Sequence, residues 1–373
     1  MAAPPHRWRS AAIGLVFGGV ALGLALWGVP LADIGMALRD VNPTWLVIPA
    51  CLFLFQQVVR SVRQMALLRS THPDHTFRSS LSVLCVSFFF INVLPARTGE
   101  VVRPMLLLER DNIPLGAGFA MVFIERLLDL TAMCAMVGIA AVTLPDSAGE
   151  QLRLPGGGSA LTLGRWMAAV GMPLIAGVLI TALFAGPQVV GGLMALWPDR
   201  GPSTLRAVRR RVASVGLGFG TALSAKRSAG TIGLVLATTL LTWGVTIAMY
   251  PALAMALGLS EFIGMREGIG ILGFTMVGMA VPSAPGFAGT YEAFARLGLA
   301  LYGVVGDTRP HGIDGPSLDG LALAFALTMH WGIHLVQSST AAWFLAVDRL
   351  SPREIVRRAW RGAPSADSPP QAP

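Results

Sequence analysis

The chain is dominated by apolar segments long enough to cross a lipid bilayer, and this excludes most soluble folds. A spanning helix needs about 20 mostly apolar residues. Segments of this length lie near 10–30, 45–68, 116–142, 163–184, 230–257 and 319–347. Hydrophobic residues make up 54% of the sequence and charged residues 13%, whereas a soluble domain carries roughly a quarter charged residues. We therefore predict an all-α polytopic membrane protein with six full transmembrane helices.

Two further apolar segments, about 81–94 and 268–281, are too short to span. At about 1.5 Å per residue each covers only about 20 Å of a hydrocarbon core about 30 Å thick. Each is followed by a Pro-rich break, "LPARTGE" or "VPSAPGFAGTYE", and then by a second apolar segment. Broken backbone at membrane depth is tolerated only where protein or water can satisfy it. We predict two re-entrant helical hairpins, at about 79–110 and 267–304.

The arginines indicate the topology. Arg7 and Arg9 flank the first apolar segment, and the segments 60–78, 185–229 and 349–361 are also rich in arginine. The loops 31–44 and 143–162 are poor in it. Because cytoplasmic loops carry the excess of Lys and Arg, we place both termini in the cytoplasm, and we expect a bacterial inner membrane. All the arginine-rich loops fall on the cytoplasmic side only if both short segments are re-entrant.

The order helix, helix, hairpin, helix then occurs twice, and the second set starts on the opposite side of the membrane. This predicts an inverted repeat with a first half at 1–142 and a second at 143–347, the latter containing a basic cytoplasmic connection at about 185–229. Residues 348–373 are expected to form a largely disordered cytoplasmic tail. Broken segments at matching positions of inverted repeats indicate a transport site near the midplane.

The stretches "VRSVRQMALL", "LPARTGEVVRPMLLL", "FIERLLDL" and "APGFAGTYEA" resemble the flippase-like family named after the transmembrane region of lysylphosphatidylglycerol synthase. The resemblance implies a protein that binds an amphiphilic lipid and moves its headgroup across the bilayer. It also implies a role beside enzymes of lipid-linked sugar, glycolipid or hopanoid metabolism. We expect no aminoacyl-transferase domain, because few residues follow the last apolar segment. The break "PSAPGFAGTYE" departs from the more Gly-rich break of the family.

Arg97, Glu100 and Arg103 form the strongest candidate site, because ionisable side chains at membrane depth indicate function. Glu100 and Arg103 are three residues apart and can face each other on a helix. A helix N-terminus with two arginines suits a phosphate or sulfate headgroup. Arg60 and Arg63 lie toward the inner end of their span, and snorkelling to the surface is the favoured interpretation of both. Arg60 is the deeper of the two and could instead complete the anion pocket. The alternative is an interfacial salt bridge with arginines that snorkel to the surface.

Glu125, Arg126 and Asp129 form a second group, about ten residues into their predicted span. One interpretation makes Glu125 or Asp129 a protonatable coupling group or a counter-charge to the arginines. The other is a structural Arg126–Asp129 pair, with Glu125 bonded to a neighbouring helix.

Glu292, His330 and His334 complete the candidates. Glu292 is a candidate for substrate binding, although an i,i+4 salt bridge with Arg296 explains it equally well. His330 and His334 are four residues apart, but the zinc-protease Glu and a third ligand are missing. We therefore expect no metal site, and interpret the histidines as packing groups or as a pH-sensitive pair.

The net charge of +8 reflects membrane topology, so we expect no nucleic-acid partner. The region Arg206–Arg211 is expected to bind an anionic lipid surface. No GxxxxGK[ST] motif occurs, and we expect no cofactor. The preferred function is a non-enzymatic lipid transporter. The alternatives are a membrane-embedded enzyme that transfers a group to or from a lipid carrier, and a non-transporting partner of such an enzyme.

Overall fold

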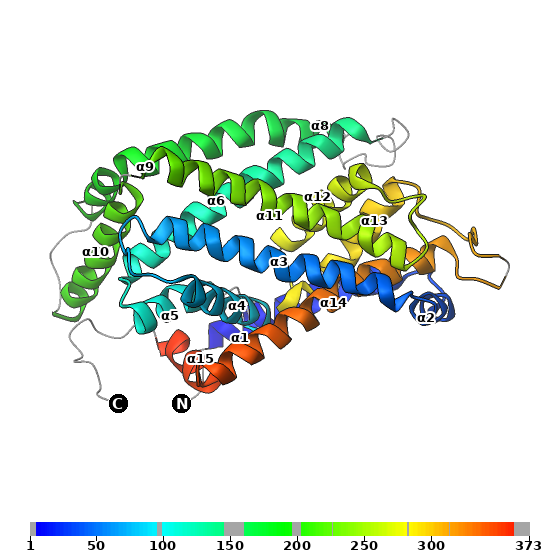
Figure 1. The fold of residues 1–373 in the computed structure, drawn as a ribbon, viewed down its shortest axis with the longest axis horizontal. Coiled ribbons are helices and arrows are strands. Elements are labelled where there is room, and N and C mark those ends of the chain that lie inside the picture. The colour runs from blue at the N-terminus through cyan, green and yellow to red at the C-terminus, as the bar shows by residue number, and fades with distance from the viewer. Residues whose placement is uncertain are drawn as a thin grey trace.

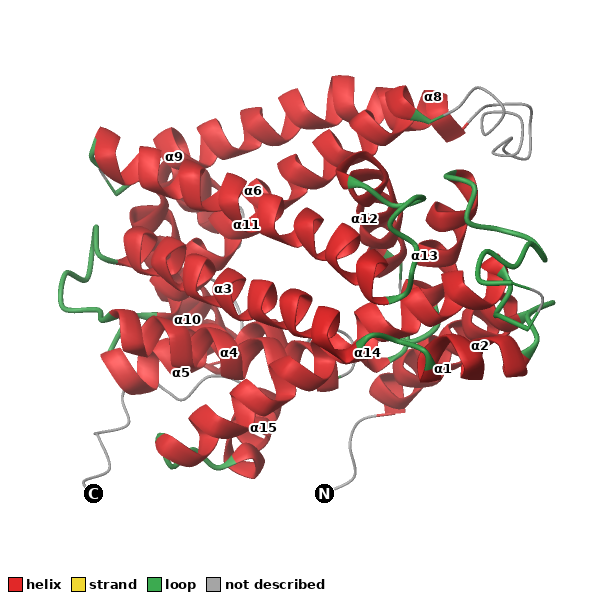
Figure 2. Ribbon diagram, turned by 45° about the vertical axis from the view of Figure 1, so that its right-hand side comes forward, coloured by secondary structure: helices red, strands yellow, loops and turns green. Residues whose placement is uncertain are grey.

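The computed structural model describes residues 5–94, 99–144, 160–195, 203–225, 227–281, 283–312 and 314–361. All regular structure in these ranges is helical (Figures 1 and 2), which confirms the all-α prediction for this part of the chain. The first half contains α1 (Pro5–Leu26), α2 (Leu31–Arg39), α3 (Pro43–Leu68), α4 (Phe77–Val93), α5 (Val102–Asp111) and α6 (Leu115–Thr143). There follow α8 (Ala160–Trp166), the π-helical turn η2 (Met167–Gly171), α9 (Met172–Ala195), α10 (Ser203–Leu223), α11 (Ala229–Ala256), α12 (Met265–Ala280), the 3-10 turn η3 (Pro285–Phe287), α13 (Thr290–Leu301), α14 (Leu318–Val347) and α15 (Pro352–Arg361).

Four helical stretches of the described residues are long and apolar enough to cross a membrane: α3, residues 164–182, α11 and α14. The pair α1–α2 makes a fifth if its 83° bend lies within one span. The bend is encoded by Gly28, whose φ is +75°, and by Pro30, which precedes α2. The 29-residue α6 is long enough, but Glu125, Arg126 and Asp129 lie within it and break its apolar character.

Helices α3 and α11 run antiparallel through the centre of the molecule, as Figure 1 shows. The start of α3 meets the end of α11, where Asn42 N donates to Ala256 O at 2.9 Å. Asn42 also caps α3, because its side chain accepts a hydrogen bond from Thr44 N at 3.0 Å, as N-cap asparagines do. Near the other end, Arg63 contacts Thr239. The two helices therefore provide one continuous wall for the polar groups described below.

Each predicted hairpin region contains two short helices that pack against one another, α4 with α5 and α12 with α13. Helix α4 lies against α3 and α14, whereas α12 lies against α11 and α6. Thr76 caps α4 by accepting from Ser79 N at 3.2 Å. Glu292 caps α13 by accepting from Gly289 N at 2.7 Å. The segment 95–98, which contains Arg97, lies outside the described residues.

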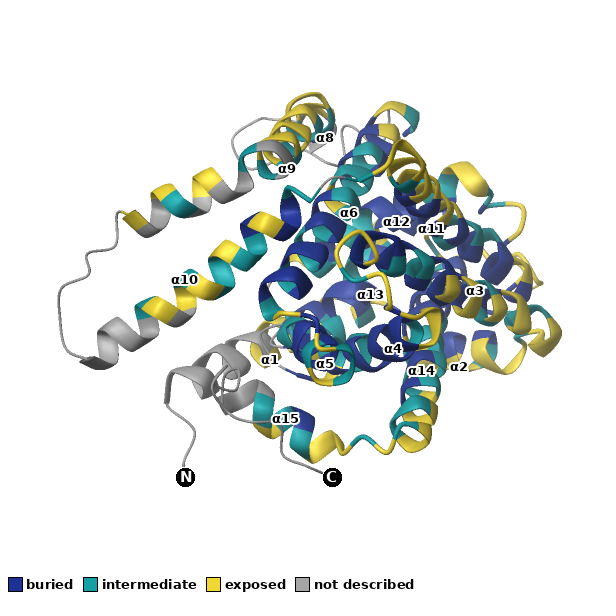
Figure 3. Ribbon diagram, turned by 60° about the vertical axis from the view of Figure 1, so that its left-hand side comes forward, coloured by how far each residue is buried: buried dark blue, intermediate teal, exposed yellow. Residues whose placement is uncertain are grey.

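Part of the basic connection at 185–229 is helical, because α9 extends to Ala195 and α10 packs on α6 and α9. Figure 3 shows α10 reaching away from the body, with buried residues gathered among α3–α6 and α11–α14. Within the predicted tail, residues 352–361 form α15. Arg358 of α15 pairs with Glu109 of α5 at 2.6 Å.

One carboxylate ties three helix ends together on the side of the molecule that carries α15. Asp348, just after α14, pairs with Arg78 of α4 at 2.8 Å and with Arg110 of α5 at 2.5 Å. It also accepts a hydrogen bond from Ser82. Burial raises the pKa of Asp348, but the hydrogen bonds from Ser82 and Arg110 outweigh it, so that this pKa lies below its ordinary value of 3.8.

Candidate functional site

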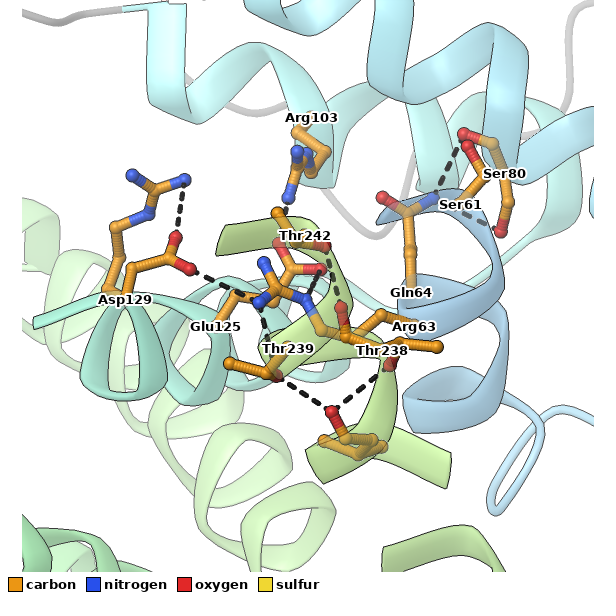
Figure 4. A network of polar contacts seen from close by, with 12 residues as sticks. Ser61, Arg63, Gln64, Ser80, Arg103, Glu125, Asp129, Thr238, Thr239 and Thr242 are labelled. Atoms are coloured by element: carbon orange, nitrogen blue, oxygen red, sulfur yellow. Dashed lines mark hydrogen bonds and ion pairs between the residues drawn. The ribbon is translucent and has the colours of Figure 1, made fainter. Parts of the chain in front are cut away.

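A cluster of charged side chains lies between α3, α5, α6 and α11, inside the helix bundle (Figure 4). We call it the arginine cluster. Its position is about 15 Å along α6 from Leu115, well within the length of a spanning helix. The members are Arg60, Arg63, Arg103, Glu125, Arg126 and Asp129.

Glu125 is the central acceptor of the cluster. It pairs with Arg103 Nη1 through Oε2, and its Oε1 lies 3.5 Å from Arg63 Nε. The exposed fraction of all three side chains is at most 2%. A carboxylate that bridges two buried arginines from different helices fixes α3, α5 and α6 relative to one another.

Asp129 extends the network by one helical turn. Arg63 Nη1 lies 3.1 Å from Asp129 Oδ1 and donates to Thr239 Oγ1 of α11 at 3.3 Å. Arg126 Nη2 lies 3.7 Å from Asp129 Oδ2. The exposed fractions of Asp129 and Arg126 are 16% and 36%, so the cluster opens to accessible space on this side.

Phe88 of α4 lies between two of the arginines. The guanidinium carbons of Arg60 and Arg103 stand 5.1 Å and 5.0 Å from its ring centroid, within the range of cation–π attraction. Arg103 Nε also donates to Ser87 Oγ at 3.3 Å. Helix α4 thus supplies an aromatic face and a hydroxyl, but no counter-charge, to the cluster.

The cluster holds more positive than negative charge, because four arginines share two carboxylates. Within the described part of the chain, Arg60 Nε, Arg103 Nη2 and Arg126 Nε are buried donors without a hydrogen-bond partner. Buried charges are normally paired, and unpaired ones are expensive. A planar guanidinium with free donors matches carboxylate and phosphate oxygens. The arrangement is therefore suited to binding an anionic group.

The sequence-predicted residues occupy different places around this cluster. Arg103 pairs with Glu125 rather than with Glu100, and Glu100 has no hydrogen-bond or ion-pair partner among the described residues. Arg97 lies outside them. Arg60 turns toward Phe88 inside the bundle, and Arg126 pairs with Asp129 as the structural interpretation predicted.

Arg63, which was predicted to snorkel to the surface, is instead a central residue of the cluster. It is 2% exposed and contacts both carboxylates. The sequence of α3 does indicate that Arg63 is buried, because polar residues recur there with the spacing of one helix face. These residues are Gln56, Gln57, Arg60, Arg63 and Gln64.

A second polar group surrounds η3 and the middle of α14. His330 Nδ1 lies 2.7 Å from Glu292 Oε1, and His330 Nε2 lies 2.8 Å from Gly286 O. Tyr291 stacks on the His330 ring with centroids 4.3 Å apart. The predicted Glu292–Arg296 pair does not form, because Arg296 donates to Ala25 O at 2.7 Å and lies 3.4 Å from Asp319.

A cavity of about 480 Å³ lies beside this group, between the end of α4, η3 and α14. Its lining is mostly apolar, and His334 and Gln337 line it on α14. His334 Nδ1 lies 2.8 Å from His330 O. His334 Nε2 and Gln337 Nε2 are buried without a partner among the described residues. The cavity is therefore bordered by the end of α4, which precedes the first Pro-rich break, and by η3, which lies within the second.

The predicted lipid-surface region lies on α10. Arg209 and Arg210 belong to this helix, and Arg210 is exposed. The side chains of Arg206 and Arg211 lie outside the described residues.

Comparison with known proteins gives two similarities. The profile of a family described as "Lysylphosphatidylglycerol synthase TM region" matches residues 11–308. "Glycosyltransferase AglD" of Haloferax volcanii is 25% identical to this chain over 303 residues, which cover 75% of this chain and 47% of that protein. The chain thus spans about half the length of that relative. No solved structure matches this chain.

Proposed function

Because the chain belongs to the family of the lysylphosphatidylglycerol synthase TM region, we propose that it is an integral membrane protein that carries a lipid headgroup across the bilayer. The headgroup is anionic or polar and binds at the arginine cluster. The candidates are a phospholipid, a polyprenyl-phosphate-linked lipid, a glycolipid and a hopanoid. The name of the relative, a glycosyltransferase, favours a lipid linked to a sugar.

The observation that carries the proposal is the unbalanced charge of the arginine cluster. Arg60 has no counter-ion contact among the described residues and retains a buried free donor. Arg103 likewise keeps Nη2 free although its Nη1 is engaged by Glu125. An anionic headgroup would supply both the missing charge and the missing acceptors. Glu125 and Asp129 hold the arginines in place and keep their mutual repulsion small when the site is empty.

We also propose that the membrane region consists of six spans and two re-entrant hairpins arranged as an inverted repeat, with halves at 1–142 and 143–347. The helix contacts support this. Helix α3 packs on α4 as α11 packs on α12, and α14 packs on α4 as α6 packs on α12. In the same way, α5 packs on α6 as α13 packs on α14. The counterparts α3 and α11 run antiparallel, as inverted repeats require.

In this topology α6 counts as a span because its charges face the arginine cluster rather than lipid. Both termini face the cytoplasm of a bacterial inner membrane. In support, contacts link the start of α4, the end of α5, the end of α14 and α15 at one side of the molecule. Arg78, Arg110 and Arg358 make these contacts, in agreement with the positive-inside rule. The exposed Arg210 of α10 would bind the anionic lipid surface.

The second candidate function is group transfer on a lipid carrier, alone or as the partner of a lipid-modifying enzyme. The name of the relative favours this alternative. Against an independent enzyme, Glu125 and Asp129 are engaged by arginines, and Glu292 is engaged by His330. Glu125 and Asp129 therefore serve as counter-charges rather than as free acids or bases.

The test is a translocation assay in proteoliposomes with a fluorescent lipid that has a phosphate headgroup. Leaflet accessibility reports movement, and mass spectrometry of the extracted lipid reports chemical change. Movement without a new lipid mass, reduced at least tenfold by Arg60→Gln, supports the transporter. A new lipid mass without movement would replace it with the enzyme. Neither signal, in protein shown to be folded, would leave only the partner role.

A further inference from the structure

The Glu292–His330 pair places two titratable groups at membrane depth, away from the arginine cluster. Its side chains are 1% and 2% exposed. Glu292 Oε1 faces His330 Nδ1 at 2.7 Å, and Glu292 Oε2 accepts from Gly289 N at 2.7 Å. His330 Nε2 faces Gly286 O at 2.8 Å. Every contact of the pair is thus short and directed.

The chemistry of these partners fixes the number of protons on the pair. A carbonyl oxygen only accepts, so His330 Nε2 carries a hydrogen that it donates to Gly286 O. The contact between Nδ1 and Glu292 Oε1 then needs one proton more. That proton is either on the carboxyl group, with a neutral imidazole, or on Nδ1, with a carboxylate and an imidazolium. In both forms the pair is neutral overall.

Loss of this proton would set an ionised carboxylate against the lone pair of Nδ1. The pair would then carry one negative charge in a buried place, and the 2.7 Å contact would become repulsive. The proton would leave to water in the neighbouring cavity or to His334 Nε2, which lines that cavity and has no partner among the described residues. The ring of His334 lies 4.5 Å from the His330 ring, centroid to centroid.

The pair holds the turn η3 at two points of its backbone. His330 binds Gly286 O inside the turn, and Glu292 binds Gly289 N just after it. The turn in turn contacts α4 and α1. A change in the proton count therefore acts directly on the backbone that separates α12 from α13.

Other titratable groups face the pair from three helices. On α14, His334 donates through Nδ1 to His330 O. On α13, Tyr291 stacks on His330, and Arg296 is bound to Ala25 O and Trp27 O. On α11, Tyr250 Oη lies 3.4 Å from Tyr291 Oη. None of these groups offers the pair an ion-pair partner in the described structure.

We propose that Glu292 and His330 form a one-proton binding site whose occupancy clamps η3, and that release of the proton frees this turn. The site goes beyond the proposed lipid movement and does not depend on it. In a lipid carrier it would couple the movement of the second predicted hairpin to a proton gradient.

Hydrogen–deuterium exchange of the full-length protein in nanodiscs tests this directly. Exchange of the peptide that contains Gly289 is measured between about pH 5 and about pH 10 and corrected for intrinsic amide chemistry. We expect corrected exchange to rise about tenfold or more above the pH of release, because repulsion between the Glu292 carboxylate and the lone pair of His330 Nδ1 opens η3 and uncovers the Gly289 amide. A corrected rate that is constant over this range overturns the proposal. Because the wild-type protein is sufficient, a variant that fails to fold does not impair the test.

Two variants make the exchange experiment more specific. Glu292→Gln imitates the protonated carboxyl group, since its amide donates to Nδ1 and its carbonyl accepts from Gly289 N. We expect protection at all pH values. The matched control is Glu267→Gln, because Glu267 accepts from Gly264 N at 3.0 Å in the same capping arrangement but is not paired with a histidine. It should keep the wild-type pH response. A Glu292→Gln protein that titrates like the wild type overturns the assignment of the proton to this pair.

Discussion

Glu125 of α6 accepts a hydrogen bond from Arg103 of α5, and both side chains are almost completely buried. The contact joins a short helix of the first predicted hairpin to the longest helix of the first half. Among the described residues, Glu125 is the acceptor that Arg103 meets on α6. Arg103 is thereby held with one guanidinium nitrogen free, and the free nitrogen defines the position of the proposed headgroup.

Replacement of Glu125 by Gln should destabilise the protein strongly. It removes the charge that two buried arginines share, and breaking a buried pair typically costs about 3–5 kcal/mol. We expect a lower midpoint of thermal unfolding in detergent. Glu261→Gln, at an exposed carboxylate after α11, is the control and should unfold like the wild type. Equal midpoints for the two variants would mean that the cluster contributes little to the fold.

Gly18 and Gly19 provide a matched pair on α1. A Cβ atom on Gly18 would lie 2.7 Å from both Ala284 Cβ and Ala288 O, whereas one on Gly19 would meet nothing within 4 Å. Gly18→Ala should push α1 away from η3 and cost about 1–3 kcal/mol, as overpacking does. Gly19→Ala should be neutral or stabilising by up to about 1 kcal/mol through helix propensity. The thermal unfolding midpoints of the two variants, measured together, test this prediction. A lower midpoint for Gly19→Ala than for Gly18→Ala would contradict the packing of α1 on η3.

The contribution of Asp348 should depend on pH. Its folded pKa lies below 3.8 because Ser82 and the arginines outweigh the effect of burial. Its stabilisation is therefore present above pH 3.8 and disappears as the pH falls through the folded value. We expect Asp348→Asn to lower the unfolding midpoint by a constant amount near neutral pH, and the difference from wild type to shrink below about pH 4. A difference that persists unchanged in acid would show that charge is not the cause.

The bounds of the long apolar helices could be predicted closely from the sequence, because a long apolar run has few alternatives in a membrane protein. The segment expected at 45–68 is α3 at Pro43–Leu68, and that expected at 319–347 is α14 at Leu318–Val347. Helix α10, within 185–229, was harder to predict, because it is amphipathic rather than continuously apolar and packs on α6 through small residues. A Cβ on Gly116 would meet the backbone of Phe219 at 2.6 Å.

The charged residues of the site were predicted except for Arg63, but the partners of Arg103 and Glu292 were not. Local spacing suggested Glu100–Arg103 and Glu292–Arg296, which are close in sequence. The structure joins Arg103 to Glu125 and Glu292 to His330 instead. Inside a bundle, a buried charge takes the partner that faces it from another helix, and helix rotation is decided by packing of the whole bundle. Such a choice cannot be read from i,i+3 or i,i+4 spacing alone.

The central claim is that the unbalanced arginine cluster binds an anionic headgroup, and lipid binding to Arg60→Gln tests it most directly. Native mass spectrometry can compare an anionic phospholipid with a zwitterionic one for the wild type and this variant. Because Arg60 has no ion-pair partner among the described residues, the variant should fold normally and lose about tenfold or more in affinity for the anionic lipid alone. Arg69→Gln, at the exposed end of α3, is the matched control. Equal anionic-lipid affinity in wild type and Arg60→Gln would contradict the account.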